Sequence, residues 1–308
     1  MSYPILDAHC DALLKLWMDR ERDYLNDPNI DANFTRLNQG NVKIQLFAIF
    51  IEPDISQEQK FQAALEQVDL FYQKVIKPHP NMKAIRSWSE LDTLEPEQIG
   101  AVLTLEGLDA IGNDLTKLRI LYQLGVRSIG MTWNQANLCA DGVGEARGAG
   151  LTELGKAVVQ CNNEAKVLTD VSHLSINGFW DVIELADYPI ASHSNAFSLC
   201  AHPRNLNDEQ IKALVKKNGF IGVVFHPHFL TGSEKATIID VIDHIDYLCS
   251  LGAEKNIGFG SDFDGIDDYV EQLRHAGEYQ NLLDELAKYY SDETVRGFAY
   301  ENFKRIAP

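Results

Sequence analysis

The sequence is poor in cysteine and in basic residues, and each shortage excludes a class of protein. Five cysteines among 308 residues, an odd number without a CxxC pair, indicate neither a disulfide framework nor a structural zinc ribbon. Lys and Arg total 27 against 45 Asp and Glu, so the formal net charge is -18. Because that charge repels phosphate groups, we expect neither nucleic acid nor an anionic membrane surface as a partner.

Long hydrophobic runs are also lacking. The most apolar stretches, residues 44–51 and 219–225, are far too short to span a bilayer. The first residues contain neither the basic region nor the apolar core of a signal peptide. We therefore expect a cytoplasmic protein that is not attached to a membrane.

The sequence alternates short β-type segments with segments of helical periodicity. The expected strands are residues 4–11, 42–50, 100–107, 126–133, 166–173, 189–195, 219–227 and 256–265, and the expected helices are residues 56–77, 152–165, 207–218, 237–251 and 279–290. Eight strands alternating with helices predict an α/β fold, a single-domain (β/α)8 TIM barrel over residues 1–308. A doubly wound open sheet is the alternative, but no glycine-rich phosphate turn follows the first strand.

Five of these strands finish with an imidazole or a carboxylate. His9 and Asp11 end the first strand two residues apart, so their side chains are expected to face the same way. The other four strands end with Glu106, His173, His193 and Asp262. Because the carboxyl ends of parallel strands meet at one rim of a barrel, we expect these side chains to line one cavity.

Such a cluster of ionisable groups requires a cation. The six side chains would repel one another and lose solvation if nothing positive lay among them. Histidine and carboxylate ligands together suit zinc, and less specifically manganese or iron. A mononuclear catalytic zinc needs only three protein ligands, so the sequence predicts a site for two divalent metal ions.

With these residues in place, the chain resembles the membrane (renal-type) dipeptidases, peptidase family M19 of the amidohydrolase superfamily. The resemblance covers nearly the whole chain and rests on DAHCD (7–11), LEG (105–107), MTWNQANLCADG (131–142), LTDVSH (168–173), SHSNAFSLCAHPRN (192–205), GFGSDFDG (258–265) and ENFKRI (301–306). The pairing of SHSNAFSLCAHPRN with GSDFDG is highly specific, whereas an HxD pair alone opens many amidohydrolases.

The resemblance implies two zinc ions per chain and divides the ligands between them. One ion would lie among His9, Asp11, Glu106 and Asp262. Glu106 would bridge to a second ion, which His173 and His193 would hold. Other divalent metals are alternatives, and the habit of the family is a homodimer.

Two further residues gain roles only from the resemblance. Arg204 would bind the terminal carboxylate of the substrate. Asn134 stands where the renal-type enzymes have a histidine that assists at the scissile carbonyl, so it would help to bind the substrate and donate a hydrogen bond to the oxyanion. Cys10 replaces a frequent asparagine in the first motif and is expected to be a small packing residue.

The implied reaction is hydrolysis of the amide bond of a short dipeptide, with D-residues accepted at its C-terminal position. A hydroxide that bridges the two metals would attack the carbonyl, and Asp262 would carry its proton to the departing amine. One alternative is deacylation of N-acyl amino acids, or another amidohydrolase reaction, at the same site. The other is a catalytically silent metal-binding protein, although every expected ligand position is filled.

Overall fold

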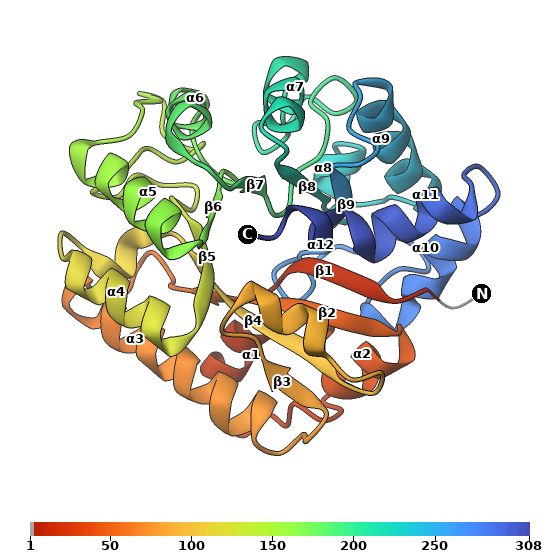
Figure 1. Cartoon of the computed structure of the whole chain (residues 1–308), viewed down its shortest axis with the longest axis horizontal. Helices are drawn as coiled ribbons and strands as arrows, with labels where there is room; N and C mark the ends of the chain where they lie inside the picture. Colours follow the sequence, from red (N-terminus) through yellow and green to blue (C-terminus); the bar gives the residue numbers. More distant parts are fainter. Residues whose placement is uncertain (1–2) are drawn as a thin grey trace.

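The strands of the computed structural model, which describes residues 3–308, form one parallel sheet. Their order is β2-β1-β9-β8-β7-β6-β5-β4-β3, and a further pairing of β2 with β4 closes the sheet (Figure 1). The barrel strands are β1 (Ile5–Cys10), β2 (Val42–Phe50), β4 (Ile99–Glu106), β5 (Val126–Gly130), β6 (Leu168–Asp170), β7 (Pro189–Ala191), β8 (Phe220–Val223) and β9 (Ile257–Phe259). The predicted eight-stranded barrel is therefore confirmed.

One strand was not predicted. β3 (Met82–Ala84) pairs with the first residues of β4, with Met82 opposite Ile99 and Ala84 opposite Ala101. β5 pairs with the later residues of β4, from Leu103 to Leu105. β3 thus lies beside the barrel and does not belong to its closed ring.

Helices cover the outside of the barrel (Figure 1). They are α1 (Ala12–Met18), α2 (Phe34–Gln39), α3 (Gln57–Leu70), α4 (Leu115–Leu124), α5 (Glu153–Ala165), α6 (Ile176–Leu185), α7 (Asp208–Lys216), α8 (Pro227–Leu230), α9 (Ile238–Ser250), α10 (Tyr279–Leu286), α11 (Asp292–Arg296) and α12 (Asn302–Ile306). A π-helical segment, Phe71–Ile76, continues α3, so the predicted helix over 56–77 is regular only in its first part.

Capping side chains explain where two predicted helices begin. The Thr152 side chain accepts a hydrogen bond from the Gly155 backbone N–H at the start of α5. Asn207 and Gln210 form a reciprocal capping box at the start of α7. Each cap satisfies backbone donors that the first turn of a helix leaves without partners. The helices that were not predicted from the sequence are α1, α2, α4, α6, α8, α11 and α12.

The amino end of the barrel is closed by apolar packing. Phe303 and Ile306 of α12 pack against the strand residues Leu6, Ile44 and Val102 in one buried cluster. Figure 1 shows α12 near the centre of the barrel, beside the C-terminus. Apolar side chains thus fill the barrel interior at this end, so function is expected at the opposite end.

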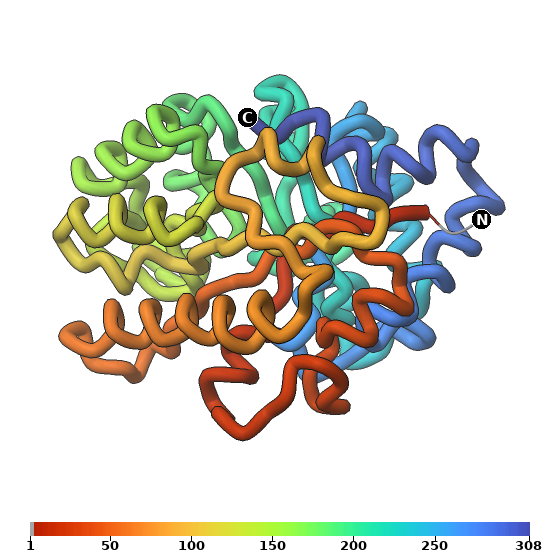
Figure 2. Tube along the Cα trace, turned by 60° about the horizontal axis from the view of Figure 1, so that its bottom comes forward, coloured from red at the N-terminus to blue at the C-terminus, as the bar shows by residue number. Residues whose placement is uncertain are grey.

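The carboxyl end carries longer connections. The segment that joins α1 to α2 runs outside the ring of helices (Figure 2). It is tied to the turn after β9, because the Asp264 carboxylate accepts hydrogen bonds from the backbone N–H groups of Asp31 and Ala32 at 2.6 and 3.0 Å. This loop therefore helps to support the rim of the barrel.

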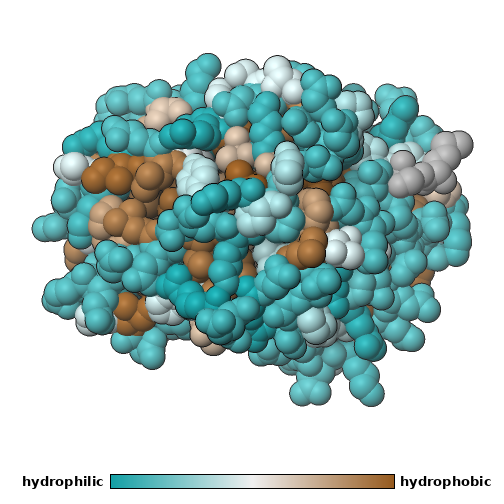
Figure 3. All heavy atoms as spheres, turned by 90° about the horizontal axis from the view of Figure 1, so that it is seen from below, coloured by the Kyte–Doolittle hydropathy of each residue, from teal (hydrophilic) through white to brown (hydrophobic). Residues whose placement is uncertain are grey.

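The surface seen from below is mostly hydrophilic, with apolar side chains gathered in one area at the left (Figure 3). Among residues 3–308, no helix has both the length and the apolar character that crossing a bilayer requires.

Candidate metal centre

The structure brings the six predicted side chains together, although several lie beyond the strands that were expected to end with them. β6 ends at Asp170, β7 at Ala191 and β9 at Phe259. His173, His193 and Asp262 follow in the turns, and Asp11 precedes α1 as its N-cap. The predicted ends of these four strands were therefore wrong by one to six residues.

Backbone conformation in the turns accounts for this difference. His173 and Asp262 have positive φ angles of 66° and 65°, which no regular strand contains. A turn of this kind aims the side chain into the mouth of the barrel after the strand has ended. Asp11 also lies outside its strand, yet its Oδ2 is 3.3 Å from Nε2 of His9.

Glu106 lies at the middle of the cluster, and its two oxygens face different groups. Oε2 lies 3.6 Å from Nε2 of His9. Oε1 lies 2.9 Å from Nε2 of His173 and 3.6 Å from Nε2 of His193. Asp262 completes the first group, with its Oδ1 3.7 Å from Nε2 of His9. The carboxylate of Glu106 thus connects two sets of donors.

The protonation of these groups follows from burial and from their mutual contacts. Burial opposes a charge on His9, but Glu106 and Asp11 outweigh it and raise the pKa of that imidazole well above its usual value. Burial, together with the charge of Arg204, lowers the pKa of His173 to about 3. Burial and the neighbouring His9 likewise lower the pKa of His193. These two imidazoles are therefore neutral, as metal ligands must be.

The pKa values of two carboxylates in the cluster, Glu106 and Asp262, are shifted in opposite directions. Burial would raise the pKa of Glu106, but His9 and His173 outweigh it and lower that pKa below its usual value. Burial, with the charges of Asp11 and Glu106, raises the pKa of Asp262 well above its usual value. A pair of acids whose pKa values are pushed apart is typical of a catalytic site.

The donor set fits divalent metal ions. Three overlapping groups each place their donor atoms within 4.8 Å of one another, namely His9 with Asp11 and Glu106, His9 with His193 and Asp262, and Glu106 with His173 and His193. Within residues 3–308, Nε2 of His9 is buried and has no hydrogen-bond partner. A buried polar atom of this kind needs a ligand, and imidazoles with carboxylates are the donors that zinc prefers.

Asn134 contacts the cluster through His173. Its Oδ1 lies 2.8 Å from Nδ1 of His173, while Nε2 of that ring faces Glu106. The hydrogen bond fixes the ring orientation and leaves the amide nitrogen of Asn134 to donate to a ligand in the cleft. Asn134 thus lies beside the cluster, where its side chain contacts one of the six donors.

Arg204 is buried at the edge of the same centre. Its Nη2 donates to the backbone carbonyl of His193 at 3.0 Å, and its guanidinium lies 5.5 Å from the ring centre of Phe229. Within residues 3–308 its Nε has no hydrogen-bond partner. A buried guanidinium with a free donor suits recognition of a carboxylate.

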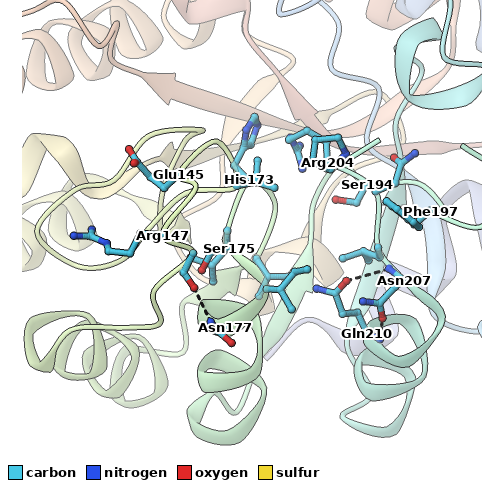
Figure 4. Close-up of a pocket in the computed structure, with 18 residues that line it drawn as sticks. Glu145, Arg147, His173, Ser175, Asn177, Ser194, Phe197, Arg204, Asn207 and Gln210 are labelled. Atoms are coloured by element: carbon cyan, nitrogen blue, oxygen red, sulfur yellow. Dashed lines mark hydrogen bonds between the residues drawn. The ribbon is translucent and has the colours of Figure 1, made fainter. Parts of the chain in front are cut away.

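The cluster opens into a cavity of about 570 Å³, here named the metal cleft. Its lining includes Asn134, Arg204, Asp262 and the apolar side chains of Phe50 and Trp133. A second cavity of about 650 Å³, the side chamber, shares Arg204 and His173 with it. Figure 4 shows the side chamber between the loop that carries Arg147 and the start of α7. Both volumes suit small molecules.

Other histidines do not join the cluster. His226 lines the metal cleft but lies apart from the six donors, whereas His228 is bound to Asp268 at 3.1 Å on the rim. His202, which the sequence analysis did not consider, also lines the metal cleft.

Two supporting residues were missed. Asp170 and Ser192 lie behind His193, and Ser192 contacts its Nδ1. The signal for Asp170 is a charged residue inside the otherwise apolar strand VLTDV.

Comparison with known proteins now identifies the family. All residues, 1–308, match the membrane dipeptidase family, peptidase family M19. The chain belongs to this family. A crystal structure described as dipeptidase AC, a metallopeptidase of family M19, superposes with a TM-score of 0.94 at 27% identity and covers 100% of this chain and 98% of its own.

Two further relatives are informative. Dipeptidase aclJ of Aspergillus oryzae is 30% identical over 272 residues, which are 83% of this chain and 64% of that protein. A metallopeptidase from Rhodobacter sphaeroides, solved with a phosphinate mimic of the dipeptide L-Ala-D-Ala, has a TM-score of 0.94 at 26% identity. The alignment covers 100% of this chain and 99% of that one. The chain is thus an M19 metallo-dipeptidase with a candidate metal cluster of His, Glu and Asp.

Proposed function

We propose that the chain is a binuclear zinc dipeptidase that cleaves dipeptides with a free C-terminal carboxylate, including those with a C-terminal D-residue. The observation that carries this proposal is the division of the Glu106 carboxylate between two donor sets. The bound mimic of L-Ala-D-Ala in the Rhodobacter sphaeroides relative supports the substrate class. A cytoplasmic location and a homodimer stay predictions from the sequence.

The metal site would be formed by the six clustered side chains. His9, Asp11 and Asp262 would hold one ion, His173 and His193 the other, and Glu106 would bridge them. When bound, the ions supply Lewis acidity, which lowers the pKa of water and polarises a carbonyl group. The protein contributes a largely buried, pre-arranged set of imidazoles and carboxylates, in which the lowered pKa values of His173 and His193 keep those two rings neutral.

Three side chains would handle the substrate. Arg204 binds the terminal carboxylate, which places the scissile bond over the cluster. Asp262 accepts a proton at its carboxylate and delivers it to the departing amine, a role that suits its raised pKa. The amide nitrogen of Asn134 donates to the carbonyl oxygen as negative charge develops there.

The test is metal analysis of the protein combined with a library of L,L- and L,D-dipeptides, before and after chelation. We expect two zinc ions per chain and hydrolysis that chelation abolishes and zinc restores. D262N removes a proposed ligand as well as the proton carrier, so we expect it to bind one ion more weakly and to lose most of its rate even with zinc in excess, because an amide cannot carry the proton. Full dipeptidase activity in D262N would refute the proton transfer, and a protein without metal would refute the site.

Deacylation of N-acyl amino acids is the second candidate, and Glu52 argues against it. Glu52 lines the metal cleft, and burial together with the charges of Asp54 and Asp11 raises its pKa. No ion pair to Glu52 is found within residues 3–308. A carboxylate in this position attracts the free ammonium group of a dipeptide, which an N-acyl amino acid lacks.

This difference can be measured as a ratio of substrates. We expect E52Q to lower kcat/KM for Ala-Ala by about tenfold, the loss of about 1.4 kcal/mol of charge attraction. Any activity on N-acetyl-alanine should not change, because that substrate has no ammonium group. An equal loss on both substrates would show that Glu52 acts on the fold of the cleft and not on the amine.

A further inference from the structure

Behind His193, a serine and an aspartate form a chain of hydrogen bonds. Nδ1 of His193 lies 2.8 Å from Oγ of Ser192, and that hydroxyl donates to Oδ2 of Asp170. Oδ1 of Asp170 accepts from the backbone N–H groups of Ser172 and Ser192 at 3.0 and 2.9 Å. Asp170, Ser172, Ser192 and His193 are all buried, so the surrounding water cannot replace these contacts.

The direction of these hydrogen bonds follows from the single proton on the Ser192 hydroxyl group. The Asp170 carboxylate can only accept, so the Ser192 hydroxyl must donate to it. Oγ of Ser192 then has only lone pairs to offer to the imidazole. Nδ1 of His193 must therefore carry the proton, and Nε2 faces Glu106 with a free lone pair.

The opposite direction would leave a buried carboxylate oxygen without its hydrogen bond and would put a proton where we propose a metal ion. Within residues 3–308, Ser192 is the only donor to Oδ2 of Asp170, so this buried oxygen would be left without a hydrogen bond if the hydroxyl donated to Nδ1. The proton on Nε2 would then lie between His193 and Nε2 of His173, 2.9 Å away, and would occupy the place of a metal ion.

Asp7 and Ser261 form a second hydrogen-bonded pair of an aspartate and a serine in the barrel, but this pair contacts no imidazole. Asp7 accepts from the backbone N–H of Ser261 at 2.9 Å and from its hydroxyl at 2.7 Å. Each serine directly precedes a side chain of the cluster, His193 or Asp262. Oγ of Ser261, however, lies near the carbonyl of His9 at 3.1 Å and accepts from the N–H of Phe263. In each pair the serine thus donates twice to the aspartate, but Ser192 contacts a ring nitrogen and Ser261 does not, and Asp7 also accepts from the Gln45 amide at 3.0 Å.

From this geometry we infer that Asp170 and Ser192 are positioning residues that fix the tautomer of His193 and present its Nε2 to a metal ion. The inference rests on the proposed metal centre. Similar partners behind metal-binding histidines typically change metal affinity by 10- to 100-fold when they are removed.

The first test reads the tautomer directly, without metal or activity. In metal-free protein labelled with 15N-histidine, two-bond ¹H–¹⁵N correlations distinguish Nδ1–H from Nε2–H, and H193Q assigns the signals of His193. We expect wild type to show Nδ1–H and S192A to lose this preference. S192T, which keeps the hydroxyl, should restore it, and S261A should leave the His193 signals unchanged. Thermal melts confirm that each variant is folded.

The second test is zinc affinity, measured by competition with a chelator. We expect S192A to lower the affinity for the zinc ion held by His193 by about 10- to 100-fold. S192T should recover most of that loss. Nε2–H in wild type, or Nδ1–H retained in folded S192A, would overturn the inference. Absence of zinc binding in wild type would instead refute the metal centre itself, so the two failures are distinguishable.

Discussion

The two ends of the barrel use buried volume in opposite ways. At the amino end, α12 places Phe303 on Phe220 and Trp88, with ring centres 4.9 and 5.9 Å apart, among aliphatic strand residues. At the carboxyl end, the same strands lead to imidazoles and carboxylates, of which His9, Asp11, His173 and His193 are buried and Glu106 and Asp262 are slightly exposed. Apolar packing stabilises the fold without any ligand, whereas a buried charged cluster is stable only with a cation or a shared proton. Stability and function are therefore expected to separate along the barrel axis.

The largest effect is expected at Glu106. E106Q removes the charge that both donor sets share, so we expect loss of at least one metal ion and a fall in kcat/KM of about 10,000-fold, equivalent to about 5.5 kcal/mol of transition-state stabilisation. Metal analysis and dipeptide kinetics measure the two effects. The exposed Glu153, changed to Gln, is the matched control and should behave as wild type. Wild-type metal content and rate in E106Q would contradict the assignment of metal binding and activity to the carboxyl end.

A slightly smaller effect, on stability alone, is expected at the amino end. F303A removes a buried ring and leaves a cavity, which costs about 3–5 kcal/mol of unfolding free energy. Denaturant unfolding measures this loss, and kcat per folded, metal-loaded molecule should stay near wild type. F303L keeps most of the volume and should lose much less. Reduced kcat in folded F303A would show that the two ends are coupled.

The sequence predicted this separation better than it predicted the local geometry. Strand periodicity and the residue types at strand ends were sufficient to find the barrel and all six clustered side chains. The turns were not predictable, because positive φ angles such as those of His173 and Asp262 are uncommon even for His and Asp, which adopt them more readily than most residues, and they leave no periodic signal. β3 was missed because three residues are too few to show an alternation.

The contacts behind the cluster were also beyond a reading of the sequence. Asp170 ends β6 and Ser192 follows β7, 22 residues later, so only the register of β6 and β7 brings them together. The role of Asn134 beside His173 likewise depends on where a long loop returns. Arg204 was found only through the family resemblance, because an arginine in a loop is usually exposed.

The smallest effect concerns a histidine at the carboxyl end that is not part of the cluster. Burial, with a contribution from His228, lowers the pKa of His226 to about 4 in the folded protein. In the unfolded chain the pKa of this imidazole is near its ordinary value of about 6.5, so as the pH falls the unfolded chain binds a proton at His226 before the folded protein does. The contribution of His226 to the unfolding free energy is therefore complete above about pH 6.5 and is lost as the pH falls from about 6.5 to 4. Because the ring is partly exposed, we expect a loss of only about 1 kcal/mol.

The measurement compares wild type with H226Q by denaturant unfolding from pH 8 to pH 4, in metal-free protein so that loss of zinc does not contribute. Glutamine keeps a polar side chain but does not titrate in this range. The difference in unfolding free energy between the two proteins should therefore be largest at pH 8 and should shrink by about 1 kcal/mol towards pH 4. A difference that stays constant with pH would mean that His226 titrates alike in both states. The pH dependence of stability at the carboxyl end would then come only from the six clustered groups.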